Sequence, residues 1–514
     1  MKKLIIAIII ILFACCGIYA GLTGNTDNNH NSIDTPDIDV ANLEEMDELV
    51  VNEEQNIEKK FYSTNESDTN TILVENNSTL NIKNSIVNKT GNSNSNGDNV
   101  DFYGTNSAIL VKKGSSANIE NVEINTNSTG SNAIFVTNSE ATETDNNPNP
   151  MNGGGPNSPE MNGEGKPPEI PEGNNEGNPK DMQNTNNMPN QENMNMDPNQ
   201  SNEDYSLGGA SATVSNVIIN TYQDKSRGID ATYGGKITVD NTQINTRGGS
   251  CAALATDRGE GTILANHCEL NTGVDNGSGR GSPCIYSTGN ISVFDSIGTS
   301  HASQIACIEG KNSITLDNCD LVCFARGNRE DNGEFVDLGG IFIYQSMSGD
   351  ADVGTATLNA TDSNLSISDE SEYYSSAPMF HVTNTKAVIN LKSCELAFGS
   401  ETLLNISGQN QWGISGSNGG DLEFNCVEED NLNGNMFIDE ISSLNLNLKQ
   451  SKYSGFINPS ENYGTTNVTI DSSSTWILTG DSHITSLTNE GNIEYGDYTL
   501  YVNGEAYTQS NPYN

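Results

Sequence analysis

Residues 227–246 read RGIDATYGGKITVDNTQINT, and this stretch holds both halves of the repeat that decides the fold. The first half, Gly228–Ala231, has the form small–apolar–x–small. The second half, Ile237–Ile244, alternates apolar residues with others and carries Asn241 at its fifth place. Alternation with a period of two is typical of β-strands, so each half predicts a short strand.

Both halves recur along the chain at intervals of about 22 to 27 residues. The first phrase begins at Ala108, Ala133, Gly228, Ala252, Cys284, Cys307 and Gly340. The fifth place of the second phrase holds Asn84, Asn121, Asn216, Asn241, His267, Asp295, Asn318 and Ser393. Short strands that recur at a fixed period indicate stacked coils. The sequence therefore predicts an all-β fold, a single-stranded right-handed parallel β-helix (a solenoid) with coils about 4.8 Å apart.

Stacking gives each repeated position a physical role. The second residues of the first phrase are expected to form one core column, which contains Ile109, Ile134, Ile229, Ile285, Ile308 and Ile341. The next residue points outward, so Tyr286 is expected on the surface. Asparagine tolerates the left-handed backbone of a repeated turn, and stacked amides can hydrogen-bond along the column. The asparagine column is therefore interpreted as structural.

Eight of the ten cysteines follow Cys16, and their spacing matches no paired zinc motif. Cys268, Cys319 and Cys394 share a column but skip a coil each time, which puts them about 9–10 Å apart, too far for a disulfide. Cys284 and Cys307 are expected on adjacent coils, and their redox state stays open. Most of the cysteines are interpreted as small packing residues.

Residues 1–22 have the plan of an export signal, with two lysines, an apolar run and then small residues. Three endings stay open. Leu12–Cys15 resembles a lipobox, which would place a lipid on Cys15; cleavage after Ala20 would release the chain; and an uncleaved Leu4–Leu22 is just long enough to span a membrane. Each predicts a secreted, cell-surface protein, lipid-anchored or otherwise held to the membrane at its N-terminus in two of the three cases.

The rest of the chain divides by composition. Residues 23–69 predict an acidic polar linker, in which Val40–Phe61 is able to form an amphipathic helix. Residues 138–206 are rich in Asn, Gly, Pro, Met and Glu, and predict a disordered insertion whose deletion should leave the thermal midpoint nearly unchanged. The β-helix is expected over 70–137 and 207–485, with a C-terminal cap and tail over 486–514.

The formal net charge is -45, from 23 basic and 68 acidic residues. Binding of nucleic acid needs a basic stripe to neutralise phosphates, so the charge excludes that class of partner. It also argues against adsorption to anionic lipid headgroups. A monomer is expected.

Several phrases carry a family resemblance: RGIDATYGG (227–235), CAALATDRGEG (251–261), GSPCIYSTG (281–289), EGKNSITLDNC (309–319), IYQSMSGDA (343–351) and STWILTGDS (474–482). In these the chain resembles bacterial and archaeal adhesin-like surface proteins with a pectin-lyase-like β-helix. The resemblance covers most of residues 70–504. It implies surface display and binding of an extracellular glycan or of a host or neighbouring cell surface, and it implies no catalytic residues.

The outward columns bring charged and aromatic residues together over four successive coils. The candidate ligand-binding residues are Asp230, Asp257, Arg258, Tyr286, Glu309, Lys311 and Tyr344. Aromatic faces stack on sugar rings and charged groups bond sugar hydroxyls, so this face predicts glycan binding. Two other interpretations stay open: the charges pair with one another on exposed turns, or the face is the active site of a polysaccharide lyase or hydrolase.

Motifs for other chemistry are absent from the sequence. There is no HExxH, GxSxG, Walker A or dinucleotide-binding motif in a strand–helix context. The sequence therefore predicts no catalytic residues, no metal ligands and no cofactor. Ca²⁺ is left open, because it needs several oxygen ligands that converge.

Overall fold

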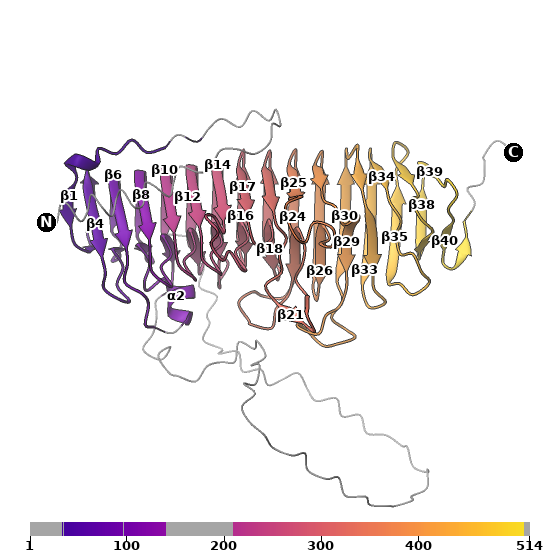
Figure 1. Ribbon diagram of the computed structural model, residues 1–514, viewed down its shortest axis with the longest axis horizontal. Coiled ribbons are helices and arrows are strands. Elements are labelled where there is room, and N and C mark those ends of the chain that lie inside the picture. The colour runs from indigo at the N-terminus through magenta and orange to yellow at the C-terminus, as the bar shows by residue number, and fades with distance from the viewer. Residues whose placement is uncertain (1–32, 34, 96, 140–208, 508–514) are drawn as a thin grey trace, which may run out of the picture. The chain divides into compact units, whose positions relative to one another are not determined.

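The computed structural model describes residues 33, 35–95, 97–139 and 209–507 (Figure 1). The expected export signal with Cys15 lies outside these residues. Of the insertion expected over 138–206, only Asn138 and Ser139 are described. Within the described residues the fold is all-β, as predicted, and its two largest sheets, of 20 and 12 strands, are built from parallel pairs.

The 20-stranded sheet, called sheet A below, contains the second phrase of the repeat. Its strands are parallel to their neighbours, and inward side chains alternate with outward ones along each strand. The 11-residue strands are β6 (Thr79–Lys89), β8 (Ser116–Thr126), β10 (Ser211–Thr221), β12 (Lys236–Thr246) and β14 (Thr262–Thr272). The later members include β16 (Asn290–Phe294), β17 (Ile297–Ser300), β19 (Ser313–Asp317), β20 (Asp320–Cys323), β24 (Thr355–Thr361), β27 (Lys386–Lys392), β30 (Asp421–Val427) and β33 (Ser443–Lys449).

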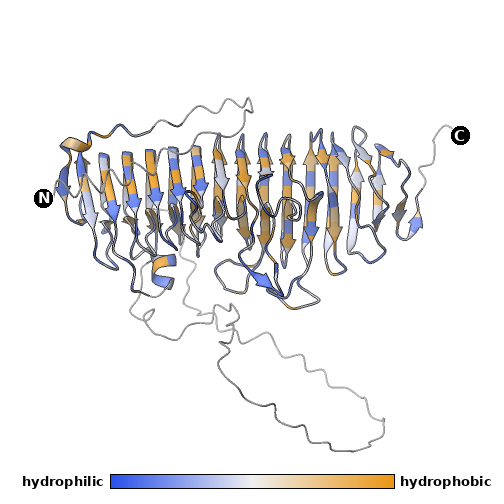
Figure 2. Ribbon diagram, in the orientation of Figure 1, coloured by the Kyte–Doolittle hydropathy of each residue, from blue (hydrophilic) through white to orange (hydrophobic). Residues whose placement is uncertain are grey.

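The 12-stranded sheet, called sheet B, contains the first phrase. Its inward side chains share one apolar core with those of sheet A, and hydrophobic residues recur along the strands of both (Figure 2). Sheet B includes β7 (Ile109–Val111), β9 (Ile134–Thr137), β11 (Ile229–Thr232), β13 (Leu254–Thr256), β15 (Ile285–Ser287), β18 (Ala306–Glu309), β23 (Ile341–Tyr344), β26 (Phe380–Thr383) and β29 (Thr402–Ile406).

The asparagine column has the predicted conformation. All eight residues at the fifth place have positive φ, between 45° and 54°. The amides also bond along the column: Asn216 Nδ2 donates to Asn121 Oδ1 at 2.9 Å, and Asn241 Nδ2 donates to Asn216 Oδ1 at 3.1 Å. The structural interpretation of this column is confirmed.

The core column is right in part. Ile109, Ile134 and Ile229 pair in register as predicted. Beyond them, Leu254 pairs with Ile229 and faces the core, although it was expected outward. Ile285 pairs with Ala306, and Ala306 pairs with Ile341, so Ile308 does not belong to this column. The predicted register slips by two residues here, which keeps the same side chains inward.

The same slip corrects the cysteine prediction. Cys307 pairs with Tyr286, so Cys284 and Cys307 are not in one column. All eight cysteines from Cys251 to Cys426 are free thiols. The prediction that Cys268 and Cys319 are separated by one intervening coil is confirmed, because Ser296 occupies the position between them. Cys268 N–H donates to Ser296 Oγ at 2.9 Å, and the next residue, Ile297, pairs with Asp320, which follows Cys319.

At the N-terminal end the expected helix is wrong. A 3-10 turn, η1 (Val40–Asn42), is followed by β1 (Glu44–Met46), β2 (Leu49–Val51), β3 (Gln55–Glu58) and β4 (Lys60–Thr64). Val51, Ile57 and Phe61 are buried because these strands pair with the next strands of the two sheets. The sheets therefore begin before residue 70. At the other end an antiparallel pair, β40 (Leu500–Val502) and β41 (Glu505–Ala506), is the last described feature.

Three segments interrupt the repeat and stand over sheet B. Helix α2 (Gly97–Tyr103) lies between β6 and β7. The hairpin of β21 (Glu330–Asp331) and β22 (Glu334–Phe335) lies between β20 and β23. A loop over 345–354 joins β23 to β24. No helix in the described part of the chain is long and apolar enough to cross a membrane.

Candidate functional site

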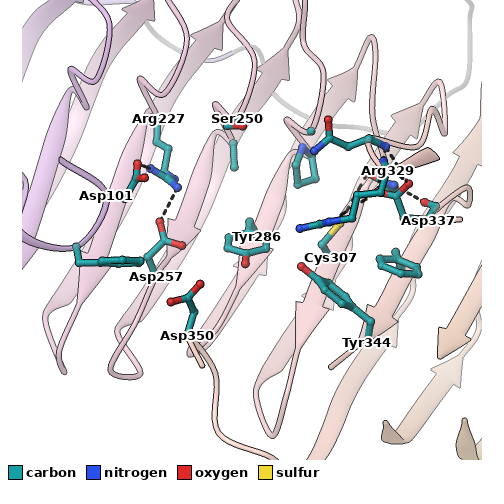
Figure 3. A pocket seen from close by; sticks show the side chains of 17 residues that line it. Asp101, Arg227, Ser250, Asp257, Tyr286, Cys307, Arg329, Asp337, Tyr344 and Asp350 are labelled. Atoms are coloured by element: carbon teal, nitrogen blue, oxygen red, sulfur yellow. Dashed lines mark hydrogen bonds and ion pairs between the residues drawn. The ribbon is translucent and has the colours of Figure 1, made fainter. Parts of the chain in front are cut away.

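One pocket lies on the outer face of sheet B, between α2, the β21–β22 hairpin and the 345–354 loop (Figure 3). Its volume is about 230 Å³. The floor comes from sheet B and the walls from the three interrupting segments. The lining includes Asp101, Phe102, Arg227, Ser250, Asp257, Pro283, Tyr286, Gln304, Cys307, Asn328, Arg329, Asp337, Phe342, Tyr344 and Asp350.

Strand alternation places the floor residues. In β15 the side chains of Ile285 and Ser287 are buried in the core, and Tyr286 points outward and is half-buried. The prediction that Tyr286 faces outward is thus confirmed. In the sheet register Tyr286 is followed by Cys307 and then by Phe342.

Aromatic rings form one side of the floor. The Phe342 and Tyr344 rings stack with centroids 4.6 Å apart. Trp412, from the 407–420 loop, packs against them with centroid distances of 5.6 Å to Phe342 and 5.2 Å to Tyr344. His381, next in the outward column, meets the Phe342 ring edge-on.

At one end of the pocket three carboxylates surround Arg227. Its guanidinium lies 3.1 Å from an Asp101 oxygen, 2.8 Å from Asp257 and 3.6 Å from Asp230. Asp230 is fully buried and Asp257 nearly so. A buried carboxylate is costly unless it is paired, and here the two buried aspartates share one cation. Asp101 is partly exposed and pairs with Lys225 as well, at 3.7 Å.

The crowding changes the acidity of this group. Burial raises the pKa of Asp257 to about 6, against the opposing effect of Arg227. Burial, and then the negative charge of Asp257, raise the pKa of Asp230 well above its ordinary value. The two aspartates therefore hold a proton to a higher pH than exposed aspartates do.

Beside Tyr286, on the same outer face of sheet B, Glu309 fixes the orientation of the tyrosine. The Tyr286 hydroxyl donates to Glu309 Oε2 at 2.9 Å, and the hydroxyl of Ser346 donates to Oε1. Glu309 is buried and does not line the pocket. Burial, followed by the charge of Glu309, raises the pKa of Tyr286 well above its ordinary value, so its hydroxyl stays protonated and keeps its hydrogen bond to Glu309.

The opposite end of the pocket is formed by Arg329. Asp337, which is buried, accepts N–H bonds from Asn328 at 2.9 Å and from Arg329 at 3.0 Å, and so fixes this backbone. The guanidinium of Arg329 lies 5.2 Å from the centroid of Trp412 and 5.8 Å from that of Tyr344. Arg227 and Arg329 thus lie on opposite sides of Tyr286 (Figure 3).

The structure brings together most of the residues predicted for the site. Asp257, Tyr286 and Tyr344 line the pocket, and Asp230 and Glu309 lie beside it, where they contact Arg227 and Tyr286. Arg258 stands at the edge, where it bonds Asp350 at 2.6 Å and covers the Phe102 ring at 3.7 Å. Lys311 is not part of the pocket, because it is exposed and pairs with Glu260 at 2.6 Å and Asp352 at 3.0 Å.

Sequence reasoning missed the walls of the site. The residues concerned are Asp101 and Phe102 of α2, and Arg329 and Asp337 beside the β21–β22 hairpin. Trp412, which packs on the aromatic side of the floor, was missed as well. One signal was present in the sequence: the run RGNREDNGEFVD at residues 326–337 is a charged insertion between two phrases of the repeat.

The acidic residues at this end of the pocket lie around a cation of the protein itself. Among the described residues no three His, Cys, Asp or Glu side chains converge in a way that would hold a metal ion. Asp101, Asp230 and Asp257 converge on a guanidinium instead. No residues are therefore assigned to Ca²⁺.

The arrangement combines flat apolar rings with hydrogen-bonding groups of both charges. A ring-shaped ligand would stack on the aromatic side, and its hydroxyls would reach the polar groups at either end. The chain was also compared with known proteins: no protein-family model, curated protein or solved structure matches it.

Proposed function

We propose that this chain is an exported, adhesin-like cell-surface protein that binds a glycan in the pocket over Tyr286. The observation that carries the proposal is the pairing of an aromatic floor with charged groups at both ends of one cavity. Sugar rings have apolar faces and a rim of hydroxyls, which match these two kinds of group.

The pocket's size fits one sugar ring. Its volume of about 230 Å³ lies below the roughly 300–1,000 Å³ of pockets that enclose drug-sized ligands. The remainder of a glycan would extend into solvent, as expected for a protein that holds on to a surface polymer.

The proposal includes a fold and a location. Parallel pairing of each strand with the next copy of its phrase, around one apolar core, supports a single right-handed parallel β-helix. The composition of residues 1–22 supports export, with Cys15 as the candidate lipid carrier.

A glycan array, followed by titration with the best ligand, tests the binding. Tyr286→Ala should weaken binding by about tenfold, because an aromatic contact is worth about 1–1.5 kcal/mol. Tyr498→Ala is the matched control, since Tyr498 is exposed and does not line the pocket. A wild-type protein that binds nothing on a broad array, or equal loss in both variants, would overturn the proposal.

A second candidate function, glycoside hydrolysis or lysis in the same pocket, is favoured by Asp257. A carboxyl with a pKa of about 6 is suited to donate a proton near neutral pH. Asp350 also lines the pocket and is held by Arg258. The release of new reducing or unsaturated ends from array ligands, lost in Asp257→Asn, would establish an enzyme in place of a binding protein.

A further inference from the structure

The pocket is blocked in both directions along the stack of strands. On the β11–β13 side stands α2, whose Asp101 and Phe102 contact Arg227 and Arg258. On the β23 side stands the segment with Arg329 and Asp337, which is tied down by the bond from Gln304 Nε2 to the Asp337 carbonyl at 2.6 Å. A polymer that runs along the stack, from strand to strand of sheet B, would collide with both walls, whereas a chain end fits between them.

Of the three arginines around the pocket, two are occupied by the protein's own carboxylates. Arg227 is surrounded by three aspartates, and Arg258 makes two bonds to Asp350. Arg329 differs: among the described residues its guanidinium has one ion pair, at 3.9 Å from Asp337, and no side-chain hydrogen bond. Asp337 is engaged instead with two backbone N–H groups.

The position of Arg329 leaves its donors available to a ligand. The guanidinium lies against Trp412 and Tyr344, and 38% of the side chain is exposed. Arginine carries five N–H donors in a planar fork that matches a carboxylate. A ring stacked on the floor would lie beside this fork, since Tyr344 belongs to both.

We propose that the pocket takes the terminal sugar of a glycan and that this sugar carries a carboxylate, held by Arg329. A terminal sialic acid and a terminal uronic acid both supply this group. The inference rests on the proposed glycan binding, and adds to it the end of the chain and the charge of the ligand.

The negative net charge of the protein repels an anionic ligand, whereas Arg329 attracts it. The distance of each charge from the ligand decides which effect is larger. The net charge of -45 is spread over the whole chain, and salt at 0.15 M screens exposed charges beyond about 8 Å. A charge-assisted pair inside the pocket is at contact distance and partly desolvated, so it is screened much less. Binding should therefore be stronger at 0.15 M salt than at 0.01 M, the reverse of a simple ion pair.

The test compares matched ligands. Glycans that end in N-acetylneuraminic acid or in glucuronic acid are titrated beside the same glycans with the carboxyl reduced to an alcohol, and beside an internal uronate polymer. Loss of the carboxylate should weaken binding roughly tenfold or more. The two acidic termini distinguish which source of carboxylate the pocket accepts.

Variants test the same contact from the protein side. Arg329→Gln should remove the preference for the acidic ligand, so that the acidic and the reduced ligand bind this variant with similar affinity. Arg326→Gln removes the same charge from the same segment without lining the pocket, and should change neither affinity. Should Arg329→Gln fail to fold, as judged by circular dichroism, the matched ligands still decide the question.

The outcomes distinguish a failure of this inference from a failure of the proposed glycan binding on which it rests. Equal binding of neutral and acidic termini, preference for an amino sugar, or equal binding of the internal polymer would overturn the inference and leave glycan binding intact. No binding of any glycan would overturn both.

Discussion

Replacing Arg227 with glutamine should destabilise the fold strongly and in a pH-dependent way. The change leaves Asp101, Asp230 and Asp257 without the cation that lies within 3.6 Å of all three. Removing one partner from a buried ion pair costs about 3–5 kcal/mol. We expect a loss in the free energy of unfolding within that range at pH 7.5.

The pH dependence follows from the raised pKa of the carboxyls. In the native protein the pKa of Asp257 rises from 3.8 to about 6, equivalent to about 3 kcal/mol at about 1.4 kcal/mol per pKa unit. A carboxyl whose pKa is raised by folding binds its proton more tightly in the folded protein than in the unfolded chain. The stabilisation of the fold by this proton is therefore complete below about pH 4 and is lost as the pH rises through about 6. Loss of Arg227 raises the pKa further, so the deficit of the variant should shrink at pH 5.

Urea denaturation followed by circular dichroism, at pH 5.0 and pH 7.5, measures both effects. Asp257→Asn tests the crowding from the other side: it leaves Arg227 with two carboxylates and should flatten the pH dependence. Lys392→Gln is the control, because it removes the cation of an exposed pair, 3.6 Å from Glu428, worth about 0–1 kcal/mol. An Arg227→Gln protein as stable as wild type at pH 7.5, or one with a larger deficit at pH 5, would refute the reasoning.

Two further substitutions test the repeat itself. Ile285→Asp should lower the thermal midpoint far more than Tyr286→Asp, because Ile285 is fully buried and Tyr286 is half-buried; similar shifts would contradict the alternation. Asn241→Ala should cost about 1–2 kcal/mol in urea denaturation, since residue 241 has φ of 45°, and Asn241→Gly should recover most of that loss; equal losses would show that the amide bond to Asn216 matters more than the backbone.

The sequence pattern predicted which side chains of a strand face the core better than it predicted which residues pair between neighbouring strands. Ile308 was placed beside Ile285, whereas Ala306 is its true partner. A slip of two residues returns every side chain to the same face, so alternation cannot detect it. At Leu254 the predicted register was wrong by one residue, because the small residues on either side of it fit an inward position equally well. That error did place the side chain of Leu254 on the wrong face of the strand.

The asparagine column was predictable because its cause is local. Each member must adopt positive φ, and few residue types other than glycine do so readily. The walls of the pocket have no such local cause. Helix α2, the β21–β22 hairpin and Trp412 are brought to the pocket by packing between segments far apart in sequence. The period of the sequence repeat carries no information about such packing.

The same separation sets an order in time for the making of the pocket. Tyr286 and Glu309, both in strands of sheet B, are 23 residues apart, whereas Asp101 and Arg227 are 126 apart and Arg258 and Asp350 are 92 apart. At about 5–20 residues per second, Asp101 leaves the ribosome roughly 6–25 s before the arginine that neutralises it. A nascent chain that ends before residue 350 would already carry the strands of the floor, yet it would lack the third wall. The strands of the floor thus leave the ribosome in sequence order, and the binding site is complete only once the 345–354 loop and, after it, Trp412 have followed.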